Sequence, residues 1–260
     1  MLTHNSPNLD AADPSWRPCL THALAKMDPD YLHKLNTTDD WLPGYKNIFN
    51  AFSLPINKTR YILFGESPYP RADSANGYAF WDNKVTHLWS ETGLSKTVNR
   101  ATSLRNIIKM LLVAEGMLNP HHTSQPDIAI LDKSKLIQSN SELFNQLLRH
   151  GFLLLNATLV LRPKQVRKDA FAWQPFIKEI LTHLVNHHPE IQLILFGSIA
   201  NIIDQLIPMP NVKKLYAEHP YNLSFIQNQE VIQFFQPFHL LRSNESRKKT
   251  EYPSLTTSDL

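Results

Sequence analysis

Three short, almost entirely apolar runs constrain the fold of this chain more than any other feature of its sequence. Each run indicates a β-strand buried on both faces, because a strand with one exposed face alternates apolar with polar residues. The runs are KTRYILFG (58–65), GFLLLNATLVL (151–161) and IQLILFGS (191–198), and VKKLYAEHP (212–220) is a weaker fourth. A sheet built from such strands must be covered on both faces by other elements.

Segments with helical spacing lie between these runs. Apolar residues recur at intervals of three and four, both between the runs and near the amino terminus. The segments are 103–118, 175–188, 198–207, 14–27 and 29–37. Strands that alternate with helices predict a parallel sheet joined by right-handed crossovers. The expected fold class is therefore α/β, with three layers (α/β/α) around a central, mostly parallel four-stranded sheet.

Length and composition indicate one large domain. The chain has 260 residues, of which 42% are hydrophobic, enough for a sizeable core. Residues 1–14 are expected to form a flexible arm and residues 15–242 the folded domain. Residues 243–260 mix charges with serine, threonine and proline, so we expect them to form a disordered tail.

Several classes of protein are excluded by residue usage. The single cysteine, Cys19, excludes a disulfide framework or a cysteine-ligated metal site built within the chain. No apolar run is long enough to span a bilayer, and the first residues lack a signal-peptide pattern. We therefore expect a cytoplasmic protein with no membrane partner. We also expect a monomer that uses no metal or organic cofactor. A net charge of +3 is compatible with an anionic partner such as nucleic acid but does not require one.

Polar groups stand where three of the predicted strands end. GESPY follows the first strand, Asn156 closes LLLN in the second, and EHPYNLS follows the fourth. Ligand sites of open parallel sheets gather beyond the carboxyl ends of the strands, and a polar group at such a point is costly without a partner. Simpler interpretations stay open: Gly65 and Pro68 shape a turn, Asn156 caps the next segment, and His219 is an ordinary loop histidine.

The order and spacing of these motifs resemble a known family. GESPYPRADSANGYAF (65–80) is similar to the GQDPYH motif of family 1 uracil-DNA glycosylases and the glycine turn and aromatic residue that follow it. LLLN (153–156) and HPYNLS (219–224) resemble that family's strand end and its HPSPLS leucine loop. LFGSIA (195–200) and AWQPFIKEIL (172–181) resemble its WGSHA motif and a tryptophan-led helix. The chain therefore resembles the uracil-DNA glycosylase superfamily over residues 16–241.

The resemblance implies an enzyme of base excision repair that flips uracil out of DNA and hydrolyses its N-glycosidic bond. Phe80 would stack on the flipped ring, and Asn156 would read its Watson–Crick edge with one acceptor and two donors. Tyr69 would stand at the C5 edge, where a thymine methyl group clashes. Gly65 would let the backbone pass close under the base. His219 would donate to the uracil oxygen on which negative charge develops.

The resemblance also implies a DNA-binding loop. Leu223 would fill the gap that the flipped nucleotide leaves. Ser103, Ser224 and backbone amides around Pro220 and Tyr221 would hold phosphates. A leucine in a turn and a helix-capping serine are the alternatives for Leu223 and Ser103.

A basic segment, LRPKQVRKDAF, follows Asn156. Lys164, Arg167 and Lys168 could add positive charge along the DNA backbone. A solvated basic loop is the equally open alternative.

The catalytic motif departs from family 1 in its polar residues. Ser67 stands where the family has the aspartate that orients the attacking water, and serine cannot supply that charge. Pro70 replaces the histidine of the motif, and Tyr221 replaces a phosphate-binding serine. Glu66 is instead similar to a superfamily branch with the motif GEAPG. We therefore expect Glu66, or Asp73 further along, to orient the water.

Other functions stay open beside uracil excision. The chain could be a DNA-binding protein of this family whose catalysis is weakened or lost, or a glycosylase for a different damaged base. A plain nucleotide-binding protein is a third possibility, although no G-x-G-x-x-G or G-x-x-x-x-G-K pattern is present. The expected partners are DNA containing uracil and a proteinaceous glycosylase inhibitor or a replication partner.

Overall fold

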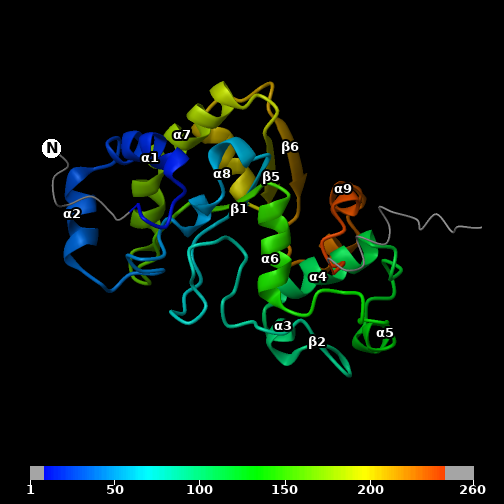
Figure 1. The fold of residues 1–260 in the computed structure, drawn as a ribbon. Helices are drawn as coiled ribbons and strands as arrows, with labels where there is room; N and C mark the ends of the chain where they lie inside the picture. Colours follow the sequence, from blue (N-terminus) through cyan, green and yellow to red (C-terminus); the bar gives the residue numbers. More distant parts are fainter. Residues whose placement is uncertain (1–8, 244–260) are drawn as a thin grey trace, which may run out of the picture.

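A central sheet of four parallel strands organises the molecule (Figure 1). The computed structural model describes residues 9–243. The strand order is β4-β1-β5-β6, and all three pairings are parallel. The strands are β1 (Tyr61–Gly65), β4 (Phe152–Asn156), β5 (Gln192–Phe196) and β6 (Lys213–Ala217). The predicted fold class is confirmed, including the weak fourth run, which forms β6.

Helices cover both faces of this sheet. The α-helices are α1 (Arg17–Leu24), α2 (Pro29–Thr37), α3 (Lys96–Arg100), α4 (Thr102–Ala114), α5 (Gln125–Ala129), α6 (Asn140–Arg149), α7 (Val166–His187), α8 (Ile199–Leu206) and α9 (Gln229–Phe235). The 3-10 helices are η1 (Pro14–Trp16), η2 (Asn50–Ser53), η3 (Ile56–Lys58), η4 (Leu223–Gln227) and η5 (Gln236–Phe238). A small antiparallel hairpin, β2 (Trp89–Ser90) with β3 (Gly93–Leu94), was not predicted.

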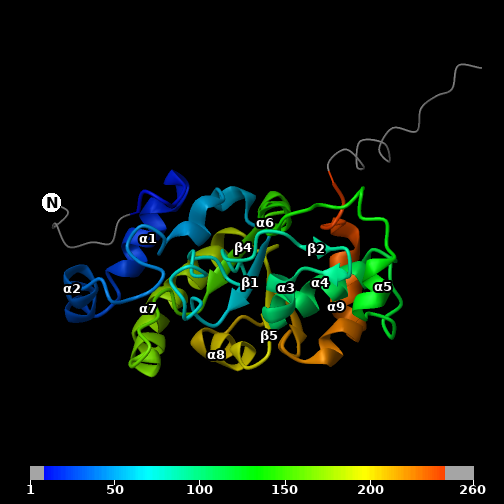
Figure 2. The ribbon, with the colours of Figure 1, turned by 90° about the horizontal axis from the view of Figure 1, so that it is seen from below.

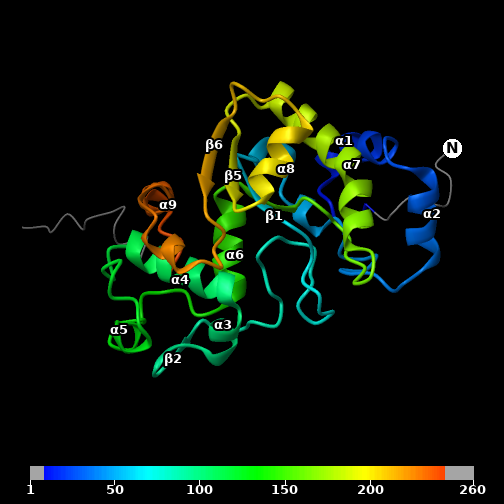
Figure 3. The same cartoon turned by 180° about the vertical axis from the view of Figure 1, so that it is seen from behind.

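Two hydrophobic cores lie on the two faces of the sheet, because successive strand residues point to opposite sides. Ile62 and Phe64 of β1 belong to one core, with residues of α1, α7 and α8. Leu63 belongs to the other, with residues of α4, α6 and α9. Figure 2 shows these helix groups on the two sides of the strands, and Figure 3 shows α8 in front of β5 and β1. Because helices cover both faces of the sheet, the side chains on both faces of each strand are buried, and this accounts for the continuous apolar runs in the sequence.

The helix boundaries differ most from the predicted ones in α7 and α4. α7 begins at Val166, well before Pro175, so the proline lies inside the helix and does not start it. The predicted helix 103–118 ends at Ala114, and Gly116 follows with φ of +71°, a conformation that glycine adopts readily.

The predicted arm overlaps the packed domain. Ala12 is buried, and the Asp13 N–H donates to the Phe52 carbonyl over 2.9 Å. Residues 9–14 therefore belong to the folded domain, which begins before the predicted residue 15. Residues 1–8 of the arm and 244–260 of the tail lie outside the described residues, so those parts stay predictions. Within residues 9–243, no helix combines the length and apolar character that crossing a membrane requires.

Candidate active site

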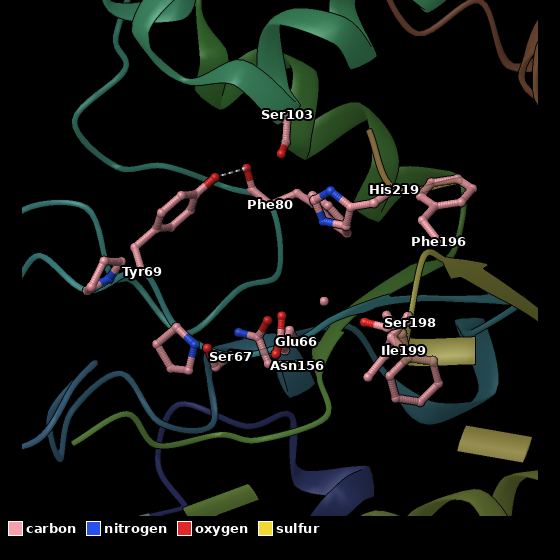
Figure 4. Close-up of a pocket in the computed structure, with 14 residues that line it drawn as sticks. Glu66, Ser67, Tyr69, Phe80, Ser103, Asn156, Phe196, Ser198, Ile199 and His219 are labelled. Atoms are coloured by element: carbon pink, nitrogen blue, oxygen red, sulfur yellow. Dashed lines mark hydrogen bonds between the residues drawn. The ribbon is translucent and has the colours of Figure 1, made fainter. Parts of the chain in front are cut away.

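A cavity of about 240 Å³ opens at the carboxyl edge of the sheet (Figure 4). This volume is below the roughly 300–1,000 Å³ typical of pockets for drug-sized ligands, and suits one flat ring. The lining residues are Phe64, Gly65, Glu66, Ser67, Pro68, Tyr69, Pro70, Phe80, Ser103, Asn156, Phe196, Ser198, Ile199 and His219. Phe64, Phe196, Ser198 and Ile199 were missed as single residues, although Phe64 lies within the first apolar run and the other three within the LFGSIA motif. The sequence-predicted residues of the first two strand ends and His219 thus meet in one place.

Gly65 and Asn156 form the floor of the cavity. They are paired at the ends of the neighbouring strands β1 and β4. A Cβ atom at Gly65 would lie 2.4 Å from Asn156 Oδ1 and 2.8 Å from the Ala79 Cβ, distances that no side chain tolerates. The close approach that requires glycine is therefore to Asn156 and Ala79. Asn156 is only 3% exposed, and its side-chain amide has no hydrogen-bond partner among residues 9–243, so it can bind a ligand.

Phe80 forms one wall from an unusual backbone conformation. Its φ is +62°, in the left-handed region that a bulky residue seldom adopts. The Tyr69 hydroxyl donates to the Phe80 carbonyl over 3.1 Å, and the Ala79 N–H donates to Leu154 of β4 over 3.0 Å. These bonds hold the strained turn in place. Burial raises the pKa of the Tyr69 phenol, so this group keeps its proton and remains a donor.

His219 faces Phe80 across the cavity, with ring centroids 6.3 Å apart. The Tyr221 N–H donates to His219 Nδ1 over 3.1 Å, which assigns the proton of the neutral ring to Nε2. Burial lowers the pKa of His219, and the Glu66 carboxylate acts in the opposite direction. A Cβ atom at Gly197, whose φ is +75°, would lie 2.8 Å from the His219 Cβ, so this glycine makes room for the histidine. The imidazole is thus set up as a neutral donor.

Glu66 and Ser67 lie beside Asn156 in the cavity (Figure 4). Glu66 is exposed and Ser67 is half-buried. Asp73, the alternative to Glu66, is absent from the lining and forms an ion pair with Lys84. Of the two carboxylates, only Glu66 is placed to act in the cavity.

The comparisons with known proteins agree with this geometry. No protein-family model matches the sequence. A uracil-DNA glycosylase of Coxiella burnetii is 30% identical over 185 residues, which cover 70% of this chain and 68% of that protein. The solved wild-type UNG structure from Nitratifractor salsuginis is 41% identical, covers 90% of this chain and 94% of that one, and has a TM-score of 0.86. This chain belongs to the uracil-DNA glycosylase family. The predicted family is confirmed.

Other relatives of the family are more distant. A uracil-DNA glycosylase of Amoebophilus asiaticus is 28% identical over 216 residues, covering 80% of this chain and 83% of that protein. A mimivirus uracil-DNA glycosylase structure has a TM-score of 0.57 at 16% identity, which supports the shared fold alone.

The loop after β6 presents the residues predicted to bind DNA. Pro220 is buried, whereas Tyr221 and Leu223 are 67% and 68% exposed. Ser224 is exposed, and its hydroxyl helps to lower the pKa of the Glu218 carboxyl. All four lie outside the lining of the 240 Å³ cavity. The loop therefore flanks the glycosylase cavity and presents two large side chains to solvent.

Ser103 lies in the first turn of α4 and lines the cavity. The interpretation of Ser103 as a helix cap is wrong, because Ala101 occupies the N-cap position of α4. Since unpaired N–H groups point out of a helix N-terminus, Ser103 stands where an anion would be favoured.

Asn106 fastens this loop to α4, a role that the sequence analysis missed. The side chain is fully buried, and Nδ2 donates to the Pro220 carbonyl over 2.8 Å. Longer bonds of 3.4 Å reach the carbonyls of Tyr221 and Asn222, and Oδ1 accepts from Arg105 Nε over 3.3 Å. An asparagine in the interior of a predicted helix is a signal that could have marked Asn106 as important, because this residue is disfavoured there, but the signal does not identify its partner.

The basic residues after β4 remain outside the cavity. Lys164, Arg167 and Lys168 are exposed. The Arg162 Nε donates to the buried Asp169 carboxylate over 2.9 Å, and this pair anchors the segment that carries them. The contact of these three residues with the DNA backbone stays a prediction. Among residues 9–243, no three His, Cys, Asp or Glu side chains are grouped so that they could hold a metal ion.

Proposed function

We propose that this chain flips uracil out of DNA into the 240 Å³ cavity and hydrolyses its N-glycosidic bond. Relatives that are named for uracil in DNA support this substrate. The observation that carries the proposal is the meeting of Phe80, Asn156 and His219 in one cavity. Phe80 comes from a strained loop, Asn156 from the end of a strand and His219 from the loop after another strand. A protein that only binds a nucleotide would not need these three side chains around one ring.

Recognition of the base rests on three side chains. The unpaired Asn156 amide offers one acceptor and two donors, which match the Watson–Crick edge of uracil and not that of cytosine. Phe80 lies where it would stack on the ring. Tyr69 lines the cavity with its hydroxyl bonded to the Phe80 carbonyl, so it cannot easily withdraw from the C5 edge. A thymine methyl group would therefore be refused by steric conflict.

The proposed roles of His219 and Glu66 follow from the charges that develop as the N-glycosidic bond breaks. As the bond from C1′ to the base breaks, its electron pair goes to uracil, and negative charge develops on an oxygen of the ring. The His219 Nε2–H would stabilise that oxygen, a contribution worth roughly 10²–10³ in rate for a single oxyanion donor. A water oxygen bonds to C1′ and passes its proton to the Glu66 carboxylate. Ser67 contributes no charge, so the anionic base and Glu66 would offset the cationic sugar.

Contacts with the rest of the nucleotide are proposed for the loop and α4. Leu223 would fill the space left by the flipped nucleotide, because its side chain is exposed beside the cavity. Ser103, Ser224 and the amides around Pro220 and Tyr221 would hold phosphates.

A single-turnover assay tests the proposal. A single-stranded oligonucleotide with one uracil is incubated with excess protein and then with alkali, which cleaves abasic sites, and the fragments are resolved by gel. We expect cleavage by the wild type and a loss of at least roughly 10²-fold in H219A and N156A. Lys26→Ala serves as the control, because Lys26 is an exposed residue in the turn after α1 and does not line the cavity.

Other outcomes would contradict the proposal in different ways. Tight binding of uracil DNA without base release would favour a DNA-binding protein that has lost catalysis. Release of another deaminated or oxidised base in preference to uracil would favour a different lesion.

The expected partners and setting remain predictions. A variant of mimivirus UNG has been solved in complex with UGI. A proteinaceous inhibitor, a replication partner, a monomeric state and a cytoplasmic location are predicted for this chain on sequence grounds.

A further inference from the structure

A second hollow, of about 530 Å³, begins at Leu223 and runs beside α4. Lys109 of α4 lines it, with His121, His122, Asp127 and Gln227. In Figure 3 the orange segment after β6 lies against α4, with α5 beyond it. We call this hollow the Lys109 groove.

The Lys109 groove and the candidate active site are lined by different residues, but the same two elements contribute to both. Leu223 belongs both to the proposed DNA-binding loop and to the groove lining. Helix α4 connects the two sites, since Ser103 lines the cavity and Lys109 the groove. These positions are six residues apart, or about 9 Å along the helix axis. One strand that holds its target nucleotide in the cavity can therefore reach the groove.

Lys109 lacks a close anionic partner. Its side chain is half-buried, and among residues 9–243 no carboxylate lies within ion-pair distance of its ammonium group. Burial and the Arg105 guanidinium lower the pKa of Lys109, whereas Asp127 raises it. Asp127 lies in the same groove but outside ion-pair distance, so the partly buried ammonium group can still pair with an anion that enters from solvent.

The remaining polar groups of the groove define what it can accept. The Asp127 carboxylate is the acid in the lining, and its Oδ2 accepts the N–H and hydroxyl of Ser124 over 2.8 and 2.6 Å. Gln227 Nε2 lies 3.3 Å from His121 Nδ1, so the amide donates and the imidazole proton is left on Nε2. His121 and His122 add flat rings that can donate hydrogen bonds or stack on bases. Such a surface suits a single nucleic-acid strand.

We propose that the Lys109 groove binds the DNA strand flanking the target nucleotide, on the side where Leu223 enters. Lys109 pairs with a backbone phosphate, and His121 and His122 contact the adjoining nucleotide. This inference rests on the proposed uracil excision and deepens it, because it assigns a preference for strands that extend in one direction.

Oligonucleotides that extend to different lengths on either side of the uracil test the proposal. A trimer with central uracil is compared with strands extended by several nucleotides on the 5′ side only or on the 3′ side only. Steady-state kinetics of base release and the Kd by fluorescence anisotropy are measured for wild type and K109Q. We expect K109Q to raise KM and Kd roughly three- to tenfold for one of the two extended strands, with kcat unchanged. The trimer and the other strand should be unaffected.

Matched variants separate binding from folding. K109R should restore the affinity, since it keeps the charge. Lys178→Ala, an exposed helix lysine on the opposite layer, should change nothing. The slope of log Kd against log salt for the affected strand should fall by about 0.7 in K109Q, the value for one phosphate contact on a single strand.

Several results would overturn the inference. Equal losses on the trimer and on both extended strands would mean that Lys109 supports the fold or the cavity, and no loss on any strand would mean that the groove does not bind DNA. If the wild type releases no uracil, the proposed function fails, but the anisotropy comparison still decides whether Lys109 contacts an extended strand.

Discussion

Replacing Gly65 with alanine is expected to misplace the asparagine that reads the base. The new Cβ would lie 2.4 Å from Asn156 Oδ1 and 2.8 Å from the Ala79 Cβ. Since non-bonded heavy atoms settle at roughly 3.5 Å, the amide must move by about 1 Å. A misplacement of about 1 Å in a reacting complex costs about 10²-fold in rate, or about 2.7 kcal/mol of transition-state stabilisation. We therefore expect kcat/KM of G65A on single-stranded uracil DNA to fall about 10²-fold.

The assay for G65A needs a glycine control and a measure of folding. Inhibition by free uracil should weaken in parallel with kcat/KM, because the same amide would bind the product. Gly116 has φ of +71°, and a Cβ atom added there would meet no atom within 4 Å, so Gly116→Ala tests backbone strain away from the cavity. It should lower the melting temperature through a cost of about 1–2 kcal/mol and leave kcat/KM unchanged. A folded G65A protein with wild-type kcat/KM and uracil inhibition would refute the reasoning.

Three further predictions concern Glu66, Asn106 and His219. E66Q should lower kcat on single-stranded uracil DNA with little change in KM, and activity equal to wild type would remove Glu66 from the mechanism. N106L leaves the loop carbonyls without their donor, so we expect chemical denaturation to show a loss of about 1–3 kcal/mol and kcat to fall; unchanged values would contradict the anchoring role. Because burial lowers the pKa of His219, the neutral donor persists below the usual value of about 6.5, and kcat should fall only at more acidic pH. E66Q removes the carboxylate that raises this pKa, so the acidic limb of its kcat–pH profile should move to lower pH, and a shift to higher pH would refute the assignment.

Local patterns in the sequence were sufficient for the fold class and for the polar groups at the strand ends, whereas Tyr69, Phe80 and Ser103 were expected from the resemblance to the family. Continuous apolar runs predict strands covered on both faces, and the two cores on either side of the sheet confirm this. Because parallel strands end at one edge, the residues after β1 and β4 had to come together, and Gly65 and Asn156 are indeed paired. The same patterns placed α7 too late, since a proline at position 175 indicates a helix start and only packing shows that the helix continues through it.

The tertiary structure decided what depends on contacts between distant segments. Asn106 and Pro220 are far apart in sequence, and nothing in either segment indicates that one donates a hydrogen bond to the other. Three other features likewise arise only when the loops are packed. They are the strained turn at Phe80, the proton position on His219 and the place of Leu223 in the lining of the Lys109 groove. Spacing along the chain reports which face a side chain occupies, whereas hydrogen bonds between loops depend on positions that the whole fold sets. The amino-acid sequence therefore determined which residues meet at the edge of the sheet, and the packed structure determined how they are held.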